Sequence, residues 1–369
     1  MKKVGILGVS GYVARELIRI LLNHPDCRIE HLVSESSTNG KDIAGIFPAF
    51  RKLLSQKTTD EPEALYECDI VLTSKPDTDS QKWVPRFIKN GCRVIDMSAA
   101  YRFRDAKIYE ATYEREHKSK ELLKDAVYGL TEIYRDKVKD ARLVANPGCY
   151  PISVILGSAP LMKYGLVDAE DIVVDAYSGT TGAGINPEAF SQYLFSELDE
   201  NMKPYKVCEH KHAPEMEQEL GLLAGQKAMV TFVPHLAPLR QGILSSIYFK
   251  LLKPGISASD LRKLYVDFYK KEFFVRVMDV GEAPAIQHVE GTNFCDIGVF
   301  ADKKSSRVVV ISAIDNLIKG AAGQAIQNLN VMLGFEETTA LVSLNAVGLP
   351  ALTREAGVEQ FIRLPIDQR

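Results

Sequence analysis

Cys149 carries the strongest indication of catalytic chemistry in this sequence. It lies in the segment NPGCYP, residues 146–151, between an apolar run expected to be a strand (residues 143–145) and one expected to be a helix (residues 152–162). A cysteine at a helix N-terminus meets N–H groups and the positive end of the helix dipole, and both favour the thiolate. We therefore predict that Cys149 is a nucleophile. Four other cysteines are expected to be small core residues: Cys27, Cys68, Cys92 and Cys295.

A histidine pair follows at residues 210 and 212. The segment CEHKH alternates as a strand would, so Cys208, His210 and His212 are expected to share one face. A metal site would need a further ligand that is not evident, and we predict no metal. Imidazole titrates near neutral pH and can serve a thiolate as acid and base. A surface pair without a chemical role is the alternative.

A loop rich in donors lies at residues 178–184, with the sequence SGTTGAG. Its N–H and hydroxyl groups suit an oxyanion, a phosphate or a carboxylate, so Ser178 and Gly179 are predicted to contact a substrate. Arg240 is a candidate for pairing with a substrate carboxylate through two hydrogen bonds. The alternatives are a flexible loop and an ordinary surface arginine.

Three glycines mark a candidate dinucleotide site near the N-terminus. Gly5, Gly8 and Gly11 have the spacing G-x-x-G-x-x-G, between an expected strand at residues 4–7 and an expected helix at residues 12–22. A phosphate can approach backbone N–H groups where no Cβ intrudes, and a helix N-terminus favours negative charge. A tight turn without a ligand is the alternative, but the strand–turn–helix context favours a cofactor.

The end of the second expected strand bears on the choice between NAD and NADP. An acid here would hold a ribose 2′-hydroxyl, so Glu35 argues for NAD. Ser34, Ser36 and Lys41 argue for NADP, because hydroxyls and a cation would hold a 2′-phosphate. The local sequence leaves both cofactors open.

The elements that would position these residues form two groups. In the first half, apolar strands alternate with amphipathic helices, which predicts a Rossmann-type doubly wound parallel sheet, an α/β domain. Its expected strands lie at residues 4–7, 29–33, 69–73 and 94–97, and its helices at residues 12–22 and 83–89. The second half predicts an α+β domain with a mostly antiparallel sheet. Its expected strands lie at residues 172–176, 230–233, 243–252, 275–280, 297–300 and 308–311, and its helices at residues 187–198 and 258–273. A long helix is expected at residues 315–333.

Composition limits the function classes. The chain has 369 residues, 45 Lys and Arg, 48 Asp and Glu, and a net charge of -3. This balance gives no reason to expect nucleic acid or a membrane surface as a partner, and no apolar run is long enough to span a bilayer. The six cysteines are too scattered for a disulfide framework. A cytoplasmic protein of two domains is expected.

Taken together, these motifs resemble those of the N-acetyl-gamma-glutamyl-phosphate reductase family of arginine biosynthesis, and more distantly aspartate-semialdehyde dehydrogenase. The resemblance runs from residue 4 to about residue 339. Its most specific segments, in order, are GVSGY (8–12), YGLTE (128–132), NPGCYP (146–151), SGTTGAG (178–184), HKHAPEME (210–217), PHL (234–236) and residues 315–327.

The resemblance implies a reaction and roles for particular residues. NADPH would reduce an acyl phosphate to an aldehyde through a thioester on Cys149. A histidine of the pair would be the acid and base; we favour His210, with His212 in substrate binding. The implied cofactor-binding residues are Gly8, Ser10, Gly11, Tyr12, Ser34 and Ser36. Because side chains alternate along a strand end, we expect the two serines to face NADP and Glu35 to face solvent.

The resemblance also implies the domain organisation. An NADP-binding domain would comprise residues 1–148 and 315–345, because the late helix would return to the first sheet. A catalytic and oligomerisation domain would comprise residues 149–314, followed by a tail at residues 346–369. The implied assembly is a homodimer or homotetramer formed through the second sheet, and the implied partner is a small acyl phosphate.

The chain also departs from the family pattern. The departures are Ala14, where a glycine is usual, Lys75, within a segment that replaces Leu-Pro-His-Gly, Ile185, which replaces Arg or Lys, and Gln241 after Arg240, where Asn-Arg is common. One rival interpretation is a related acyl-phosphate reductase, such as aspartate-semialdehyde dehydrogenase or a lysine-pathway enzyme. Another is a catalytically silent NADP-binding regulator, against which the retained Cys149 and histidine pair argue.

Overall fold

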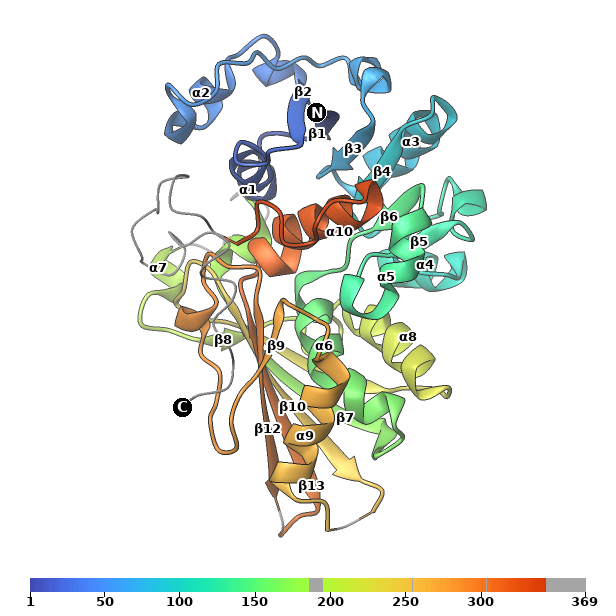
Figure 1. The fold of residues 1–369 in the computed structure, drawn as a ribbon, viewed down its shortest axis with the longest axis vertical. Coiled ribbons are helices and arrows are strands. Elements are labelled where there is room, and N and C mark those ends of the chain that lie inside the picture. Colours follow the sequence, from blue (N-terminus) through green and yellow to red (C-terminus); the bar gives the residue numbers. More distant parts are fainter. Residues whose placement is uncertain (186–194, 254, 303, 343–369) are drawn as a thin grey trace.

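Two sheets, one above the other in Figure 1, organise the chain. The computed structural model describes residues 1–185, 195–253, 255–302 and 304–342. The tail predicted at residues 346–369 lies outside the described residues, as does most of the helix expected at residues 187–198. The helices are α1 (Tyr12–Leu21), α2 (Ile43–Ile46), α3 (Asp77–Lys89), α4 (Ala106–Tyr113), α5 (Thr131–Asp140), α6 (Cys149–Lys163), α7 (Phe195–Leu198), α8 (Ala213–Ala224), α9 (Ala258–Tyr269) and α10 (Gly323–Leu333).

The first sheet has six strands in the order β2-β1-β3-β4-β6-β5, and every neighbouring pair is parallel. Its strands are β1 (Lys2–Leu7), β2 (Cys27–Val33), β3 (Ile70–Thr73), β4 (Arg93–Asp96), β5 (Ala126–Tyr128) and β6 (Leu143–Ala145). Helices cover both faces. Val4 and Ile6 pack into a cluster with α1 and α10, whereas Leu7 packs into a second cluster with α3. The predicted doubly wound α/β domain is confirmed.

The second sheet has seven strands in the order β11-β12-β13-β10-β7-β9-β8. Its strands are β7 (Val167–Ser178), β8 (Lys203–Pro204), β9 (Val230–Leu236), β10 (Ile243–Leu251), β11 (Val275–Val277), β12 (Cys295–Asp302) and β13 (Arg307–Ile314). Most neighbouring pairs are antiparallel, and only β7–β9 and β11–β12 are parallel. The prediction of a mostly antiparallel sheet is confirmed.

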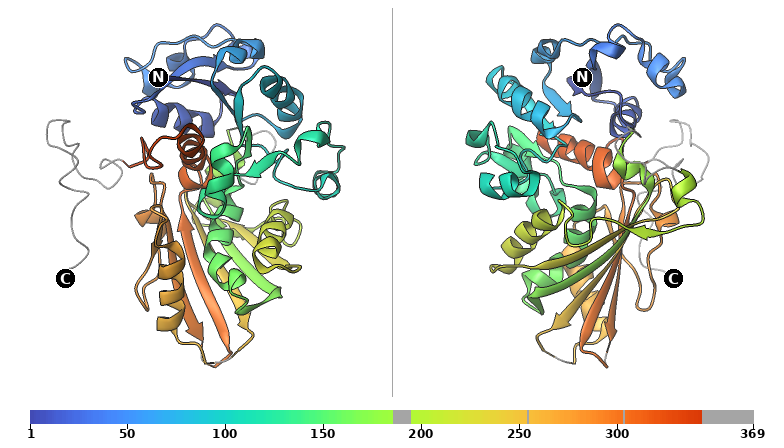
Figure 2. Two further views of the ribbon diagram at one scale, coloured as in Figure 1. Left: turned by 45° about the vertical axis from the view of Figure 1, so that its right-hand side comes forward. Right: turned by 180° about the vertical axis from the view of Figure 1, so that it is seen from behind.

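Helices α6, α8 and α9 cover one face of this second sheet and share its core cluster. Along β7 the side chains alternate between buried and partly exposed positions, as expected for a strand with one covered face. The view from behind in Figure 2 shows no described helix across the other face. This face is thus the one left for contacts outside the described chain.

The helix expected at residues 315–333 begins at Ile318, and its first turn is π-helical. Asp315 precedes the helical segment, and its carboxylate accepts the N–H groups of Leu317 and Ile318 at 2.8 and 2.9 Å. One π-helical turn, Ile318–Ala322, then leads into α10. α10 packs on α5 and α1, so the late segment joins the first sheet (Figure 1). The domain boundaries near residues 148 and 315 stay a prediction.

A buried polar network ties this late segment to the first domain. Lys319 and Glu132 are both inaccessible to solvent and pair at 2.5 Å, and Gln327 bonds to each of them. Removing only one partner of an ion pair this deep would strongly destabilise the fold, because the other charge would be left buried and unpaired.

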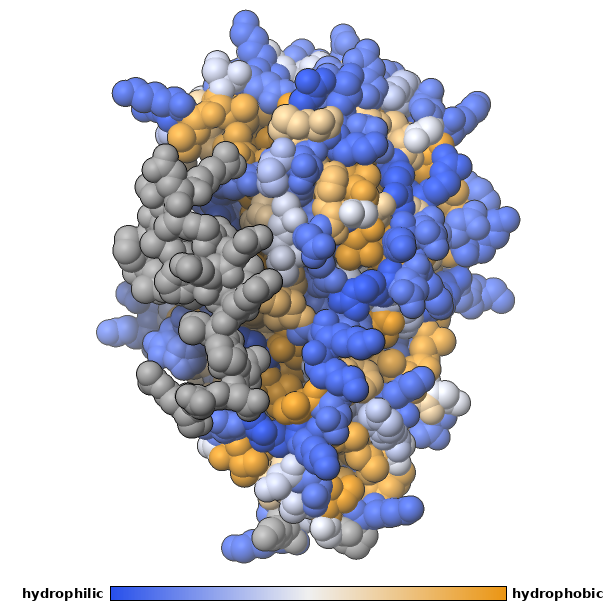
Figure 3. Space-filling view, viewed as in Figure 1, coloured by the Kyte–Doolittle hydropathy of each residue, from blue (hydrophilic) through white to orange (hydrophobic). Residues whose placement is uncertain are grey.

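The surface and the helices bear on membrane association. No described helix has both the length and the apolar character needed to cross a bilayer. The face in Figure 3 is largely hydrophilic, with smaller hydrophobic areas between the charged side chains.

Candidate active site

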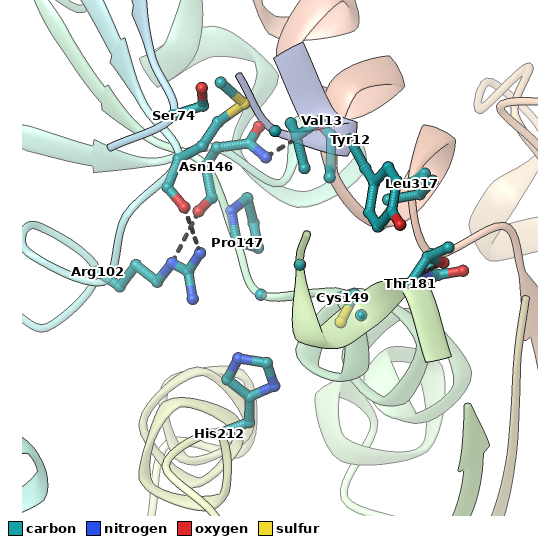
Figure 4. A pocket seen from close by; sticks show the side chains of 18 of the residues that line it. Tyr12, Val13, Ser74, Arg102, Asn146, Pro147, Cys149, Thr181, His212 and Leu317 are labelled. Atoms are coloured by element: carbon teal, nitrogen blue, oxygen red, sulfur yellow. Dashed lines mark hydrogen bonds between the residues drawn. The ribbon is translucent and has the colours of Figure 1, made fainter. Parts of the chain in front are cut away.

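Cys149 lies where two cavities meet. It is the first residue of α6, directly after the N-cap Gly148. A cavity of about 320 Å³ opens toward the first domain, and one of about 250 Å³ opens toward the second; Cys149, Gly182 and His212 line both. Figure 4 shows the first of these cavities, with the Cys149 sulfur and the His212 ring facing the same hollow.

The first cavity is lined by the glycine turn. Gly11 is the N-cap of α1, and an added Cβ there would meet no atom within 4 Å, so the N-terminus of α1 is open to a phosphate. Gly8 has φ of +93°, and its N–H donates to Val33 at 2.8 Å. Tyr12 lines the cavity, and Ser10 is partly exposed in the turn.

Gly5 differs from the sequence interpretation, whereas the departure at Ala14 is accommodated. Gly5 does not lie in the turn but within β1, where a Cβ would come 2.4 Å from a methyl group of Leu65. It therefore serves close packing rather than phosphate binding. Ala14 is fully buried in the core under α1, so its methyl group is accommodated.

The residues after β2 do not continue the strand alternation. β2 ends at Val33, and residues 36–38 form a short 3-10 turn. Ser34 is buried with its hydroxyl bonded to that of Thr38, whereas Ser36 is exposed. Glu35 is exposed but reaches Lys75, which lines the first cavity. Glu35 is exposed, as expected, but the two serines do not share an inward face, because Ser34 is buried and Ser36 is exposed.

The second cavity collects most of the predicted substrate residues. Ser178, Gly179, His210 and His212 line it, together with two lysines, Lys206 and Lys211. The lysines were not singled out from the sequence. Because two cations stand near the nucleophile, this cavity suits an anionic substrate.

Arg240 is not brought to this site. Its side chain is 63% exposed, its guanidinium lies 3.5 Å from Glu290, and the residue lines neither cavity. Its carbonyl instead accepts the hydroxyl of Thr181 at 2.7 Å, so its backbone shapes the donor loop. The neighbouring Gln241 donates to Asp315 at 2.6 Å, behind the cavities. Ile185, another departure, is half exposed.

The segment around the histidines is a turn and not a strand. Cys208 has φ of +59° and is exposed, and α8 begins at Ala213. Cys208 therefore does not share a strand face with His210 and His212, which removes the geometric basis for a three-ligand set.

The two histidines occupy different places. His212 lies against the nucleophile turn, which we define as residues 146–148 directly before Cys149. A Cβ added to Gly148 would come 2.6 Å from Nε2 of His212. Burial, with the positive charges of Arg102 and Lys206, lowers the pKa of His212 to about 3, and its buried Nδ1 has no partner within the described chain. The ring of His210 accepts the backbone N–H of His212 on Nδ1 at 3.1 Å.

The imidazole of His210 is surrounded by aromatic side chains. Tyr150, Phe232 and His212 make edge contacts with it. Burial, together with the neighbouring His212 and Lys206, lowers its pKa to about 2. Both imidazoles are thus neutral near pH 7, but the geometry favours His212 as the group that serves Cys149.

Burial outweighs the helix dipole at Cys149. Desolvation raises the pKa of the thiol to about 11, although the backbone N–H of Tyr150 and the charge of Arg102 favour the thiolate. Desolvation therefore opposes the thiolate that the helix position favours, and a neighbouring base would help to remove the proton.

A buried group of hydrogen bonds and one ion pair, which the sequence did not indicate, holds the nucleophile turn in place. The Glu215 carboxylate on α8 accepts the N–H of Gly148 at 2.9 Å and the hydroxyl of Tyr128 at 2.8 Å. It also pairs at 3.2 Å with Arg102, which donates to the carbonyl oxygen of Asn146 at 2.8 Å (Figure 4). These contacts fix the residues before Cys149 from both domains.

The thiol pKa gives a first prediction. In a Cys208→Ser background, alkylation of Cys149 by iodoacetamide should accelerate about tenfold for each pH unit up to about pH 10, because only the thiolate reacts. Mass spectrometry of the modified peptide measures the rate. A rate that levels off below pH 8 would contradict the raised pKa.

Gly320 gives a second prediction. In the π-helical turn, a Cβ at residue 320 would come 2.9 Å from the Cβ of Cys149. Gly320→Ala should therefore displace the nucleophile, reduce kcat, and cost about 1–3 kcal/mol of unfolding free energy. Gly45→Ala is the matched control, since a Cβ there meets nothing within 4 Å. Equal effects of both substitutions on kcat would refute the role of this contact.

Comparison with known proteins places the two domains. The semialdehyde dehydrogenase NAD binding domain matches residues 3–141, and the semialdehyde dehydrogenase dimerisation domain matches residues 149–316. Among solved structures, aspartate semialdehyde dehydrogenase II of Vibrio cholerae complexed with ASA has a TM-score of 0.70 and 19% identity, covering 90% of this chain and 98% of that one. The Candida albicans enzyme with NADP has a TM-score of 0.66 and 18% identity, with coverage of 90% and 98%. These structures confirm the fold.

Sequence relatives narrow the family. N-acetyl-gamma-glutamyl-phosphate reductase of Geobacter sulfurreducens is 49% identical over 350 residues, covering 94% of this chain and 100% of the relative. The protein of that name from Thermoanaerobacter pseudethanolicus is 46% identical over 345 residues, covering 92% and 98%. The resemblance inferred from the motifs is confirmed: this chain belongs to the N-acetyl-gamma-glutamyl-phosphate reductase family.

Proposed function

We propose that the protein reduces N-acetyl-L-glutamyl 5-phosphate to N-acetyl-L-glutamate 5-semialdehyde with NADPH and releases phosphate, a step of arginine biosynthesis. The observation that carries the proposal is the position of Cys149 between the two cavities. One begins at a glycine turn suited to a dinucleotide, and the other holds cations suited to an acyl phosphate.

The thiol and an imidazole share the first step. We infer that His212 takes the proton from Sγ of Cys149 as the sulfur attacks the acyl carbonyl. The C–O bond to phosphate breaks, phosphate takes up a proton from solvent and leaves as HPO4²⁻, and a thioester remains on Cys149. The negative charge of the bound acyl phosphate raises the proton affinity of His212, which offsets the burial and the positive charges that lower its pKa. His210 positions His212 through its bond to the His212 N–H.

The second step reverses the proton movement. NADPH, when bound, supplies the hydride that reduces the thioester carbonyl. The N–H groups at the start of α6 stabilise the oxyanion that forms there. When the C–S bond breaks, the aldehyde leaves, and His212 returns the proton to the thiolate of Cys149.

Other residues of the site bind rather than react. Residues 8–12 cradle the pyrophosphate at the N-terminus of α1, and Ser34 and Ser36 stand at the ribose end after β2. Ser178 and Gly179, with Lys206 and Lys211, receive the anionic substrate. Lys211 lies over the ring of Tyr113, with its Nζ 4.6 Å from the ring centre, which holds the cation at the cavity.

The assembly and the compartment complete the proposal. We propose a homodimer or homotetramer formed through the uncovered face of the second sheet, which lies in the matched dimerisation domain. Light scattering would find two or four chains per particle. A cytoplasmic location agrees with the cysteines, all six of which are free thiols.

One assay tests the reaction. In the reverse direction, the enzyme should form NADPH from N-acetylglutamate semialdehyde, phosphate and NADP⁺, and formation should stop when phosphate is left out. Aspartate semialdehyde is the competing substrate. Faster turnover of aspartate semialdehyde would assign the protein to the related dehydrogenase activity instead.

A further inference from the structure

We propose that Lys75 selects the phosphorylated cofactor by leaving Glu35 and pairing with the 2′-phosphate of NADPH. The inference deepens the proposed function and rests on its use of NADPH. It gives a task to a residue that departs from the family pattern.

Lys75 is placed between the two ends of the cofactor site. Lys75 follows β3. Its Cγ packs against the glycine turn at residues 8–11, 3.0 Å from where a Cβ of Gly8 would lie. Its ammonium group reaches the end of β2, with Nζ 3.0 Å from Glu35 and 3.9 Å from Asp79. The side chain is only 16% exposed, so its methylene groups are fixed by packing while its ammonium group contacts Glu35, the candidate ribose-binding residue.

The partner of Lys75 is the residue that would otherwise oppose NADPH. An acid after the second strand of such a fold accepts the ribose hydroxyls of NAD and repels a 2′-phosphate. The Glu35 side chain is 64% exposed, so its pair with Lys75 is screened by water and is readily exchanged. A phosphate monoester carries about two negative charges at neutral pH and competes well with a single carboxylate.

The neighbouring donors are less suited to the same task. Ser34 is buried with its hydroxyl engaged by Thr38, and Ser36 offers one neutral hydroxyl on an exposed turn. Lys75 supplies positive charge, and a charged hydrogen bond contributes more than a neutral one. We therefore assign the discrimination between NADPH and NADH to Lys75 rather than to the serines.

Cofactor affinity of the full chain tests this directly. Titrations followed by cofactor fluorescence should show that Lys75→Met weakens NADPH binding by about 10- to 100-fold, as expected when one charged hydrogen bond is lost. NADH affinity should stay nearly unchanged, and Lys75→Arg should retain the preference for NADPH. Lys89→Met is the matched control, because it removes an exposed charge from the far end of α3.

The role of Glu35 is tested by a double-mutant cycle. Glu35→Gln should tighten NADPH binding, because it releases Lys75 and removes the repulsion. This gain should shrink in the Lys75→Met background, because the two side chains act on each other. Independent effects of the two substitutions would refute the exchange of partners.

The remaining outcomes separate this inference from the proposed function. Equal loss of NADPH and NADH affinity in Lys75→Met, or no loss, would overturn the inference, as would a loss specific to NADPH in Lys41→Met but not in Lys75→Met. Tighter binding of NADH than NADPH by the unaltered protein would instead refute the proposed cofactor, whatever the variants show.

Discussion

Replacing Cys149 by serine is expected to reduce turnover by several orders of magnitude while NADPH still binds. A serine hydroxyl occupies nearly the same place, but its anion is far less accessible than a thiolate, and no thioester can form. The comparison of kcat with the NADPH dissociation constant measures the two effects separately.

The matched control for this substitution is Cys208→Ser. Cys208 is exposed in the turn before α8 and should tolerate the change with little loss of kcat. If Cys149→Ser kept near-normal turnover, the thioester route would be wrong. If it lost NADPH binding as well, the substitution would have disturbed the first cavity and not only the nucleophile.

The second large effect is expected from His212→Asn. Loss of the base should reduce kcat by about 10²- to 10⁴-fold, the range typical of general acid–base assistance. His210→Asn should have a smaller effect, because that ring supports His212 through one hydrogen bond and ring contacts. Steady-state kinetics of both variants across pH measure the difference.

The two histidine variants also decide between two interpretations. The sequence favoured His210 as the acid and base, and the structure places His212 beside the residue before Cys149. A larger loss of kcat in His210→Asn than in His212→Asn would return the role to His210. Equal small losses would show that solvent accepts the proton.

Local sequence predicted the parts of the site that depend on local structure. Cys149 stands at the start of a helix because Pro and Gly precede an apolar run, and Gly11 precedes α1 for a similar reason. The alternation of strands and helices predicted the first sheet, because parallel strands need helical crossovers. These signals lie within a few residues of the feature that they predict.

Long-range packing decided what the sequence did not predict. Arg102 and Glu215 are 113 residues apart, and nothing local indicates that they meet. The raised pKa of Cys149 depends on how both domains exclude water from the sulfur. The turn at Cys208 has the composition of a strand, but α8 follows directly, and tertiary context overrides the alternation.

The late helix α10, which packs in the core of the first sheet, affects how the chain folds during its synthesis. Ile326 and Leu329 of α10 pack into the same core cluster as Val4 and Leu17. A ribosome adding about 5–20 residues per second needs roughly 15–60 s to pass from the first of these partners to the last. Throughout that time the apolar face of the nascent first sheet lacks its late helix. The early half of the chain therefore exposes apolar surface that chaperones could bind until α10 has been synthesised.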